Sequence, residues 1–229
     1  VTGGSSGIGA EIARQAAADD RDVIVVSRTT GPVGTHVGAD LSQADGWSAF
    51  AALVADSAVG ADRLEIFHCA GTLTPIGFAG ETDAAAYRAN VLLNSAAPQI
   101  LGDAVLRSVA GHGVPTTLVM ITSGAARTAY PGWSAYCAGK AAMDHWVRTV
   151  GEEQRLRDGV KVVAIAPGVV DTEMQSEIRQ TDPSDFPNVE RFRTLHAEGE
   201  LRDPAAVAAR IRSVVEGLES GAVVDLRDL

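Results

Sequence analysis

The stretch Thr2-Gly3-Gly4-Ser5-Ser6-Gly7-Ile8-Gly9 decides the fold that we expect of this chain. It stands between a short apolar stub at Val1 and a segment with apolar residues at helical spacing, so the pattern is strand, glycine turn, helix. Glycines in such a turn let backbone N–H groups approach a pyrophosphate, and the positive end of the following helix faces the same anion. The stretch predicts a dinucleotide site, and we expect the first strand to begin before Val1.

The rest of the chain alternates short β-branched runs with longer helical patterns, which is typical of βαβ units around a parallel sheet. With the stub at Val1 making seven, the expected strands are Val23–Ser27, Thr35–Ala39, Leu64–Cys69, Thr116–Thr122, Val160–Ala166 and Ala222–Leu226. The expected helices are Ile8–Ala18, Gln43–Ser57, Ala84–Val109, Trp133–Arg157 and Pro204–Glu219. The strands are apolar throughout rather than alternating, so both sheet faces are expected to be buried. We expect one α/β domain over residues 1–229, a Rossmann-type doubly wound parallel sheet.

Composition excludes several classes of protein. The 229 residues are 46% hydrophobic and 21% charged, a globular balance, with 19 Lys+Arg against 29 Asp+Glu. A net charge of −10 disfavours nucleic acid and anionic membranes as partners, and no apolar run approaches the ~20 residues that span a bilayer. Cys69 and Cys137 form no disulfide framework or metal-ligand spacing, and no secretory signal opens the chain. We expect no metal, and we expect the protein to reside in a reducing, cytoplasmic compartment.

The end of the second expected strand indicates which dinucleotide binds. An acid there would accept from the ribose 2′-OH of NAD(H), whereas a cation would hold the 2′-phosphate of NADP(H). Here the strand ends in Ser27-Arg28, and a guanidinium chelates phosphate well. The pair therefore favours NADP(H); the alternative is that Arg28 is a solvated surface residue.

Tyr136 and Lys140 lie four residues apart on an expected helix, which puts both side chains on one face. A lysine ammonium near a phenol favours the phenolate, so we expect it to lower the pKa of Tyr136 and make the phenol a usable proton donor. Ser123 ends the preceding strand, at the sheet edge where ligands of open α/β sheets bind.

Residues 171–203 interrupt the βα rhythm. The segment is polar and holds Pro183, Phe186 and Pro187, so we expect little contribution from it to the core. One interpretation is a surface excursion, and the other is a lid over a site at the strand ends.

Together these residues resemble the short-chain dehydrogenase/reductase family over essentially the whole chain. The family's order and spacing recur in the glycine turn, Asp40-Leu41, Ala70-Gly71, Asn90, Ser123, Tyr136, Lys140 and Pro167-Gly168-Val169-Val170-Asp171-Thr172. One departure is His68-Cys69 in place of the usual Asn-Asn, and we expect His68 to be a packed strand residue rather than a ligand.

The resemblance implies roles for four residues in catalysis. Tyr136 is the general acid/base, Ser123 orients the substrate carbonyl, and Lys140 holds the nicotinamide ribose and tunes Tyr136. Asn90 supports a proton-relay water. Members of the family are usually dimers or tetramers, which implies a homodimer or homotetramer through the helices expected at 84–109 and 133–157.

The resemblance also implies a cofactor site. Asp40 and Leu41 would flank the adenine, and Val170 and Thr172 would hold the carboxamide. Ser6 stands where many NADP-dependent members carry a second basic residue, so the NADP(H) interpretation depends on Ser27 and Arg28. The full set implied to bind the dinucleotide is Gly3, Ser5, Ser6, Gly7, Ile8, Gly9, Ser27, Arg28, Asp40, Leu41, Ala70, Gly71, Tyr136, Lys140, Pro167, Gly168, Val170 and Thr172.

Within the family, three regions resemble the group that contains the sepiapterin reductases and the bacterial reductases of benzil. These regions are 131–140, 166–175 and 220–225, and residues 185–192 are especially similar to the bacterial enzymes. The group's substrates carry vicinal dicarbonyls, so Trp133 and Met174 would line an apolar pocket; the alternative for each is core packing. Asp225 matches the carboxylate that anchors the pterin in sepiapterin reductases, with a surface acid at a strand end as the alternative.

The expected activity is hydride transfer from NADPH to one carbonyl of an α-dicarbonyl or related ketone, a small-molecule substrate. Within the same class, the alternatives are a dehydrogenase that runs toward the ketone or a ketoreductase acting on another metabolite. A different class, a non-catalytic sensor of dinucleotides on the same fold, would have no need of the proton donor that Tyr136 provides.

Overall fold

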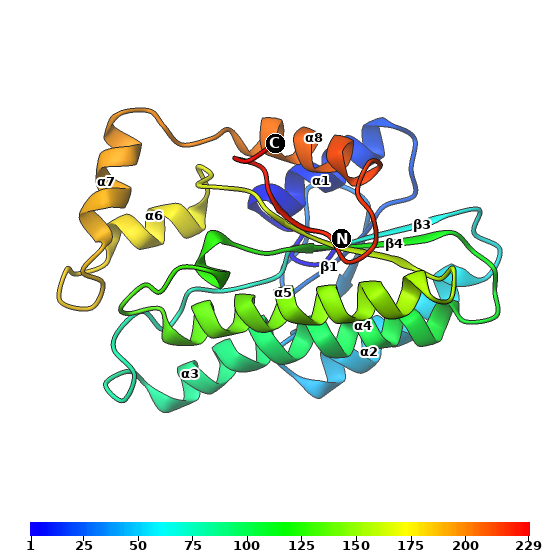
Figure 1. Cartoon of the computed structure of the whole chain (residues 1–229), viewed down its shortest axis with the longest axis horizontal. Helices are drawn as coiled ribbons and strands as arrows, with labels where there is room; N and C mark the ends of the chain where they lie inside the picture. Colours follow the sequence, from blue (N-terminus) through cyan, green and yellow to red (C-terminus); the bar gives the residue numbers. More distant parts are fainter.

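A computed structural model that describes residues 1–229 has a parallel sheet between two layers of helices (Figure 1). The strands are β1 (Ile24–Ser27), β2 (Thr35–Gly38), β3 (Leu64–His68), β4 (Thr116–Ile121), β5 (Lys161–Ala166) and β6 (Val223–Asp225). Neighbours pair in parallel in two groups, β1 with β2 and β3-β4-β5-β6. The expected doubly wound α/β class is therefore confirmed.

The expected seventh strand is a single residue. Thr2 makes parallel bridges to Val26 and to His68, so it joins the two groups of strands at the centre of the sheet. The expectation of seven strands is wrong, because the chain enters the glycine turn at Gly3, directly after this residue. The turn still emerges between β1 and β3, where a dinucleotide-binding sheet requires it.

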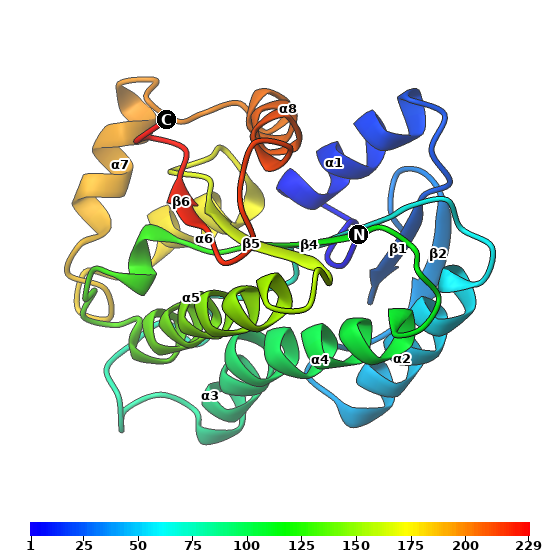
Figure 2. The same ribbon diagram turned by 45° about the vertical axis from the view of Figure 1, so that its right-hand side comes forward.

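Two helical layers cover the sheet (Figure 2). The helices α1 (Gly7–Ala18) and α8 (Pro204–Val215) pack on one face. The other face carries α2 (Ala44–Ala58), α4 (Ala97–Val109) and α5 (Ser134–Arg155). Successive residues of β4 point into opposite layers, with Met120 facing α4 and α5 and Val119 facing α1 and α8. None of the helices combines the length and apolar character that crossing a membrane requires.

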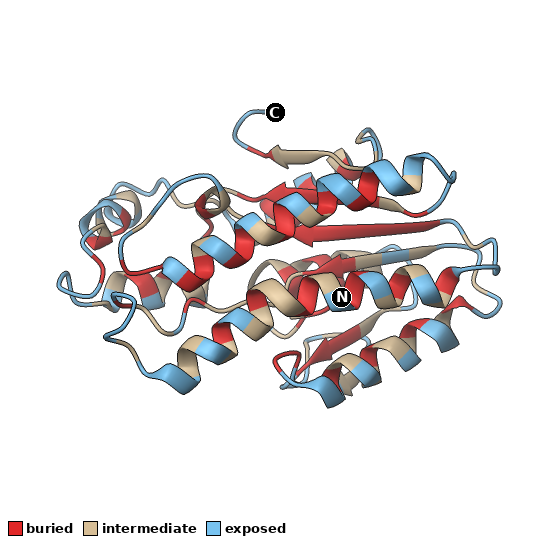
Figure 3. Ribbon diagram, turned by 60° about the horizontal axis from the view of Figure 1, so that its bottom comes forward, coloured by how far each residue is buried: buried red, intermediate tan, exposed pale blue.

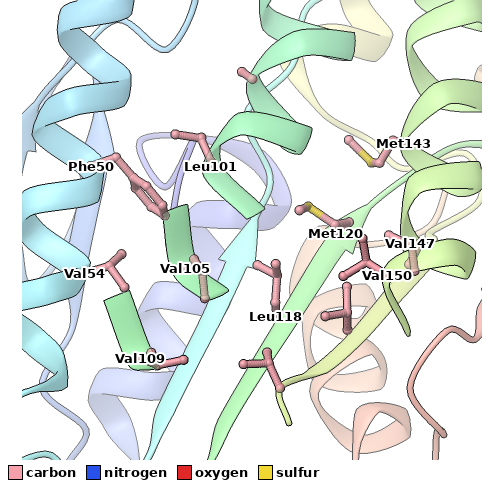
Figure 4. Close-up of a cluster of buried hydrophobic side chains, with 14 of the residues drawn as sticks. Phe50, Val54, Leu101, Val105, Val109, Leu118, Met120, Met143, Val147 and Val150 are labelled. Carbon is pink, nitrogen blue, oxygen red and sulfur yellow. The ribbon is translucent and has the colours of Figure 1, made fainter. Parts of the chain in front are cut away.

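The core explains the apolar strands. In Figure 4, Leu118 and Met120 of β4 lie beside side chains of α4 and α5, such as Leu101 and Met143. Figure 3 shows the central strands buried while the helices alternate between buried and exposed residues. Both faces of β4 and β5 are buried, as the unbroken apolar runs predict.

The helix expected at 84–109 is divided. The helix α3 (Ala84–Val91) continues through one turn of π-helix at Leu92–Ala96 into α4. A π turn inserts an extra residue into the helical ladder and often marks a functional position. The apolar pattern runs through it without a break, so the sequence carried no signal for it.

Residues 171–203 hold two helices, α6 (Glu173–Gln180) and α7 (Val189–Ala197), at one end of the sheet (Figure 1). Phe186, Val189 and Phe192 are buried. They share an apolar cluster with Trp133 and Tyr136, separate from the two clusters on the faces of the sheet. The expectation that this segment adds little to the core is wrong. Its apolar residues are few, but Val189 and Phe192 lie on one face of α7, and Phe186, which precedes the helix, packs into the same cluster.

Candidate active site

A cavity of about 740 Å³ lies where the glycine turn and the loops after β1, β3, β4 and β5 converge. Every residue that the sequence placed in the site lines this cavity except Asn90 and Asp225. Sequence reasoning did not identify other lining residues with functional groups or aromatic rings, namely Thr29, Cys69, Thr122, Thr128, Tyr130, Glu173, Gln175, Arg191, Phe192 and Arg227.

The glycine turn forms a cradle for an anion. Gly7, at φ +53°, adopts a left-handed conformation, and a Cβ at Gly9 would lie 2.4 Å from the carbonyl oxygen of Gly3. The N–H groups of Gly7, Ile8 and Gly9 donate to no protein acceptor, and the first turn of α1 holds no acid. Free amides at a positive helix end suit the pyrophosphate of a dinucleotide.

The end of β1 presents a free cation. Arg28 is exposed on the cavity wall and forms no ion pair. Ser27 is buried, and its hydroxyl donates to the carbonyl oxygen of Thr29 at 2.6 Å. The nearby carboxylate of Asp40 accepts hydrogen bonds from the backbone and hydroxyl of Ser42, which lower its pKa. Because Asp40 is satisfied locally, the Arg28 guanidinium remains available to an anionic ligand.

Tyr136 and Lys140 share the buried face of α5 toward the cavity. The Nζ atom of Lys140 lies 5.8 Å from the centre of the Tyr136 ring and donates to the carbonyl oxygen of Ile121 at 2.8 Å. Burial lowers the pKa of Lys140 to about 8, so the side chain is mostly an ammonium at neutral pH.

The expectation that Lys140 lowers the pKa of Tyr136 is wrong for this structure. Burial raises the pKa of Tyr136 to about 12, and hydrogen bonding by Ser123 opposes that rise only in part. Desolvation is the largest effect on the phenol, and the ammonium donates its hydrogen bond to Ile121 rather than to the phenol. Tyr136 is therefore a protonated donor, with Ser123 beside it.

Asn90 lies behind the cavity wall, fully buried, at the end of α3. Its Nδ2 donates to the carbonyl oxygen of Thr74 at 2.9 Å, and its Oδ1 accepts from Nδ2 of Asn94 at 2.8 Å. Asn94, which sequence reasoning missed, stands in the π turn and also donates to the carbonyl oxygen of Thr72 at 2.7 Å. The two asparagines fix the loop after β3, while a proton-relay role for Asn90 stays a prediction.

His68 and Cys69 replace the two asparagines usual in the resembled family. The Nδ1 atom of His68 lies 2.9 Å from the Thr2 hydroxyl, and burial lowers the pKa of the ring to about 3. His68 is thus a neutral, packed strand residue, as expected. Burial raises the pKa of the Cys69 thiol to about 12, so it is not a nucleophile at neutral pH.

The far end of the cavity is aromatic. Trp133 stacks on Phe186 with ring centroids 4.3 Å apart and meets Tyr136 edge-on at 5.8 Å. It is 4% exposed and also lines the cavity, so the interpretations as core residue and as pocket wall both hold. Met174, at the start of α6, lines the same end. A flat apolar group fits this wall.

Asp225 is not a surface acid, since it is only 2% exposed. Its carboxylate accepts from Nε and Nη2 of Arg227 at 2.9 and 2.6 Å and from Nη2 of Arg127 at 3.0 Å. The hydrogen bonds from Arg227 lower the pKa of Asp225. The structure brings Arg227, not Asp225, to the cavity wall, and a contact between Asp225 and substrate stays a prediction.

Comparisons with known proteins agree with this geometry. The family profile described as short chain dehydrogenase matches residues 1–183. The chain is 37% identical over 238 residues to the benzil reductase ((S)-benzoin forming) of Bacillus subtilis (strain 168), covering 100% of this chain and 97% of that protein. It is 34% identical over 172 residues to the sepiapterin reductase of Rattus norvegicus, covering 73% of this chain and 64% of the relative.

A solved structure shares the fold. The crystal structure of a short chain dehydrogenase/reductase from Saccharomyces cerevisiae superposes with a TM-score of 0.84 at 26% identity, covering 98% of this chain and 93% of that one. The two resemblances noted in the sequence, to the broad family and to the group with benzil and sepiapterin reductases, are both confirmed.

Proposed function

Because the chain belongs to the short-chain dehydrogenase family, and is an oxidoreductase of carbonyl or alcohol groups, we propose that it is an NADPH-dependent reductase of α-dicarbonyl compounds or related ketones. One observation carries the proposal. Ser123, Tyr136 and Lys140 line the same cavity as the anion-binding glycine turn, so a proton donor and a dinucleotide cradle open on one space. Relatives named as benzil reductases support the substrate class.

The residues divide the chemistry between them. A bound nicotinamide dinucleotide supplies the hydride. Ser123 donates a hydrogen bond to the carbonyl oxygen and holds it beside Tyr136, which transfers its phenolic proton to that oxygen. The ammonium of Lys140 stabilises the phenolate that remains. The aromatic wall around Trp133 excludes water and aligns the substrate, and such positioning supplies much of the rate.

Arg28 supports the choice of NADPH over NADH. It follows β1 on the cavity wall and has no carboxylate partner, and no acid stands next to it in sequence to accept from a ribose 2′-OH. Guanidinium and phosphate form charge-assisted, bidentate hydrogen bonds. The free Arg28 side chain therefore suits the 2′-phosphate.

A substrate screen tests the proposal. NADPH absorbance is followed with benzil, other diketones and sepiapterin, and the assay is repeated with NADH. We expect turnover of at least one dicarbonyl, with the higher kcat/KM for NADPH. Tight binding of NADPH with no turnover of any carbonyl would favour the sensor. Faster reduction of NADP⁺ by the alcohols would favour a dehydrogenase that runs toward the ketone.

A further inference from the structure

Arg227 is held rigidly by the buried carboxylate of Asp225, the last residue of β6. Its backbone N–H and Nε donate to Oδ1 of Asp225 at 3.0 and 2.9 Å, and its Nη2 donates to Oδ2 at 2.6 Å. Nη1 has no protein partner. Arg127 binds the same carboxylate at 3.0 Å, so two guanidinium groups share one negative charge. Asp228 also interacts electrostatically with Arg227, so two carboxylates balance the two guanidinium groups, and Nη1 of Arg227 remains a pre-oriented, unused donor.

This side chain lies beside the reacting groups. A Cβ added at Gly124 would sit 3.1 Å from Nη2 of Arg227, and one added at Gly168 would sit 3.5 Å from its Cγ and Cδ. Gly124 directly follows Ser123, and Gly168 belongs to the loop after β5 that lines the cavity. The absence of side chains at both positions leaves the space that Arg227 occupies along the cavity wall.

A second cation lines the same end of the cavity. Arg191 of α7 donates from Nη1 to the hydroxyl of Tyr130 at 3.2 Å and has no carboxylate partner. The acids on the whole cavity wall are Asp40, which faces the adenine end beside Arg28, and Glu173. The carbonyl end thus combines a flat aromatic wall with two guanidinium groups and one acid, Glu173 at the start of α6.

We infer that the substrate is an anion, an aryl-substituted 2-oxo acid whose carboxylate binds Arg227; this inference rests on the proposed reductase function. The keto oxygen would lie between Ser123 and Tyr136, with the aryl group against Trp133. One hydride from NADPH and the Tyr136 proton convert the ketone into the alcohol of a 2-hydroxy acid and leave NADP⁺. The Arg227 guanidinium packs beside Gly124, the residue after Ser123, so it would reach a carboxylate on the carbon next to the ketone.

The test compares an acid with its uncharged ester. Benzoylformate and methyl benzoylformate share the aryl ketone and differ in charge, and each is assayed for kcat/KM with NADPH. Arg227→Met should lower kcat/KM for the acid by about 10- to 100-fold, as loss of a hydrogen bond to a charged group does, and change the ester less than threefold. Arg210→Met, an exposed arginine of α8, serves as the matched control and should change neither.

A second variant leaves Asp225 fully paired. Arg191→Met should lower the ratio of acid to ester rates several-fold without disturbing the Asp225 cluster, whose partners are Arg127 and Arg227. Equal losses on acid and ester, or a weaker Kd for NADPH in both variants, would overturn the inference. If the wild-type protein reduces diketones and the ester but discriminates against the acid, only this inference fails. If it reduces no carbonyl compound, the proposed function fails.

Discussion

The two ends of the cavity are built in different ways. The dinucleotide end consists mainly of backbone, with the turn at residues 2–9 and the loops after β1 and β3 held by main-chain hydrogen bonds such as Thr2 N to Phe67 O at 2.9 Å. The carbonyl end consists of side chains from separate segments, with Trp133, Phe192 and Arg227 all on the cavity wall and Phe186 stacked behind Trp133. A backbone site leaves its pattern in a short window of sequence, whereas a side-chain site is assembled from the whole chain.

The comparison separates cofactor binding from substrate selection. Changes at the dinucleotide end should alter the use of NADPH whatever carbonyl is reduced. Changes at the carbonyl end should alter the choice of carbonyl and leave the affinity for NADPH unchanged. Tyr136 belongs to both ends, because its ring meets Trp133 and its neighbour on α5 is Lys140.

The largest effect is expected at this junction. Tyr136→Phe removes the proton donor and leaves the ring packed against Trp133, so kcat should fall by about 10²- to 10⁴-fold with every carbonyl substrate. The Kd for NADPH, measured by fluorescence titration, should stay within twofold. A variant that keeps more than half of the wild-type kcat would show that another group delivers the proton.

Lys140 should reveal its burial through the pH dependence of stability. Its folded pKa of about 8 lies below the ordinary 10.5, so the unfolded chain binds more protons between these values and the free energy of unfolding rises with pH there. At about 1.4 kcal/mol per pH unit the gain reaches about 3 kcal/mol by pH 10.5. Urea unfolding of the wild type and Lys140→Met at pH 7 and pH 10 measures it.

The difference between the two proteins isolates Lys140. The wild type gains free energy of unfolding as Lys140 loses its proton, whereas the methionine does not titrate. We therefore expect the free energy of unfolding of Lys140→Met, relative to that of the wild type, to fall by most of this gain between pH 7 and pH 10. Tyr136 has the opposite sign, because its folded pKa of about 12 stabilises the fold below pH 10 and that stability is lost as pH rises further. Both proteins keep Tyr136, so its contribution largely cancels. A difference independent of pH would show that the ammonium is solvated.

Arg28→Ala tests the dinucleotide end alone. The loss of charge-assisted hydrogen bonds to a 2′-phosphate should lower kcat/KM for NADPH by about 10- to 100-fold and leave the value for NADH within threefold. Arg63→Ala, an exposed arginine that pairs with Glu65, is the matched control. An unchanged value for NADPH would make Arg28 a solvated surface residue.

The same contrast explains what the sequence predicted. Gly7, Ser123, Tyr136 and Lys140 were found because each stands at a fixed place relative to a strand or helix that periodicity alone defines. The shift in the pKa of Tyr136 was predicted in the wrong direction, because the sequence spacing shows that an ammonium is near but not how deeply the phenol is buried. The charge of a residue can be read from the sequence, whereas the desolvation of its side chain can be known only from the fold.

Other features had no local signal at all. Asn94 lies four residues after Asn90, yet this spacing on a helix does not indicate that both side chains bind the loop after β3. Arg227 and Arg191 look like surface cations in sequence, and only the fold shows that both line the cavity. The apolar side of residues 186–192 was obscured by the polar residues between its members.

The smallest expected effect concerns whether the carbonyl end moves. Phe186 belongs to an apolar cluster distinct from the two that flank the sheet, so α6 and α7 can open while β4 and β5 stay folded. We propose that the segment 171–203 is a lid that closes on NADPH and substrate. Amide hydrogen exchange in α6 and α7 should be faster than in β4 and β5 and should slow when both ligands bind.

Phe186→Leu sharpens this test, because it removes the stacking on Trp133 and weakens the cluster by about 1 kcal/mol. Exchange should speed up severalfold in α6 and α7 alone, and KM for aryl ketones should rise while the Kd for NADPH stays constant. Phe50→Leu, in the cluster between α2 and the sheet, is the matched control. It should speed exchange in the strands too, rather than in α6 and α7 alone. Equal protection of α6 and α7 with and without ligands would instead mean that a rigid wall, not a lid, selects the substrate.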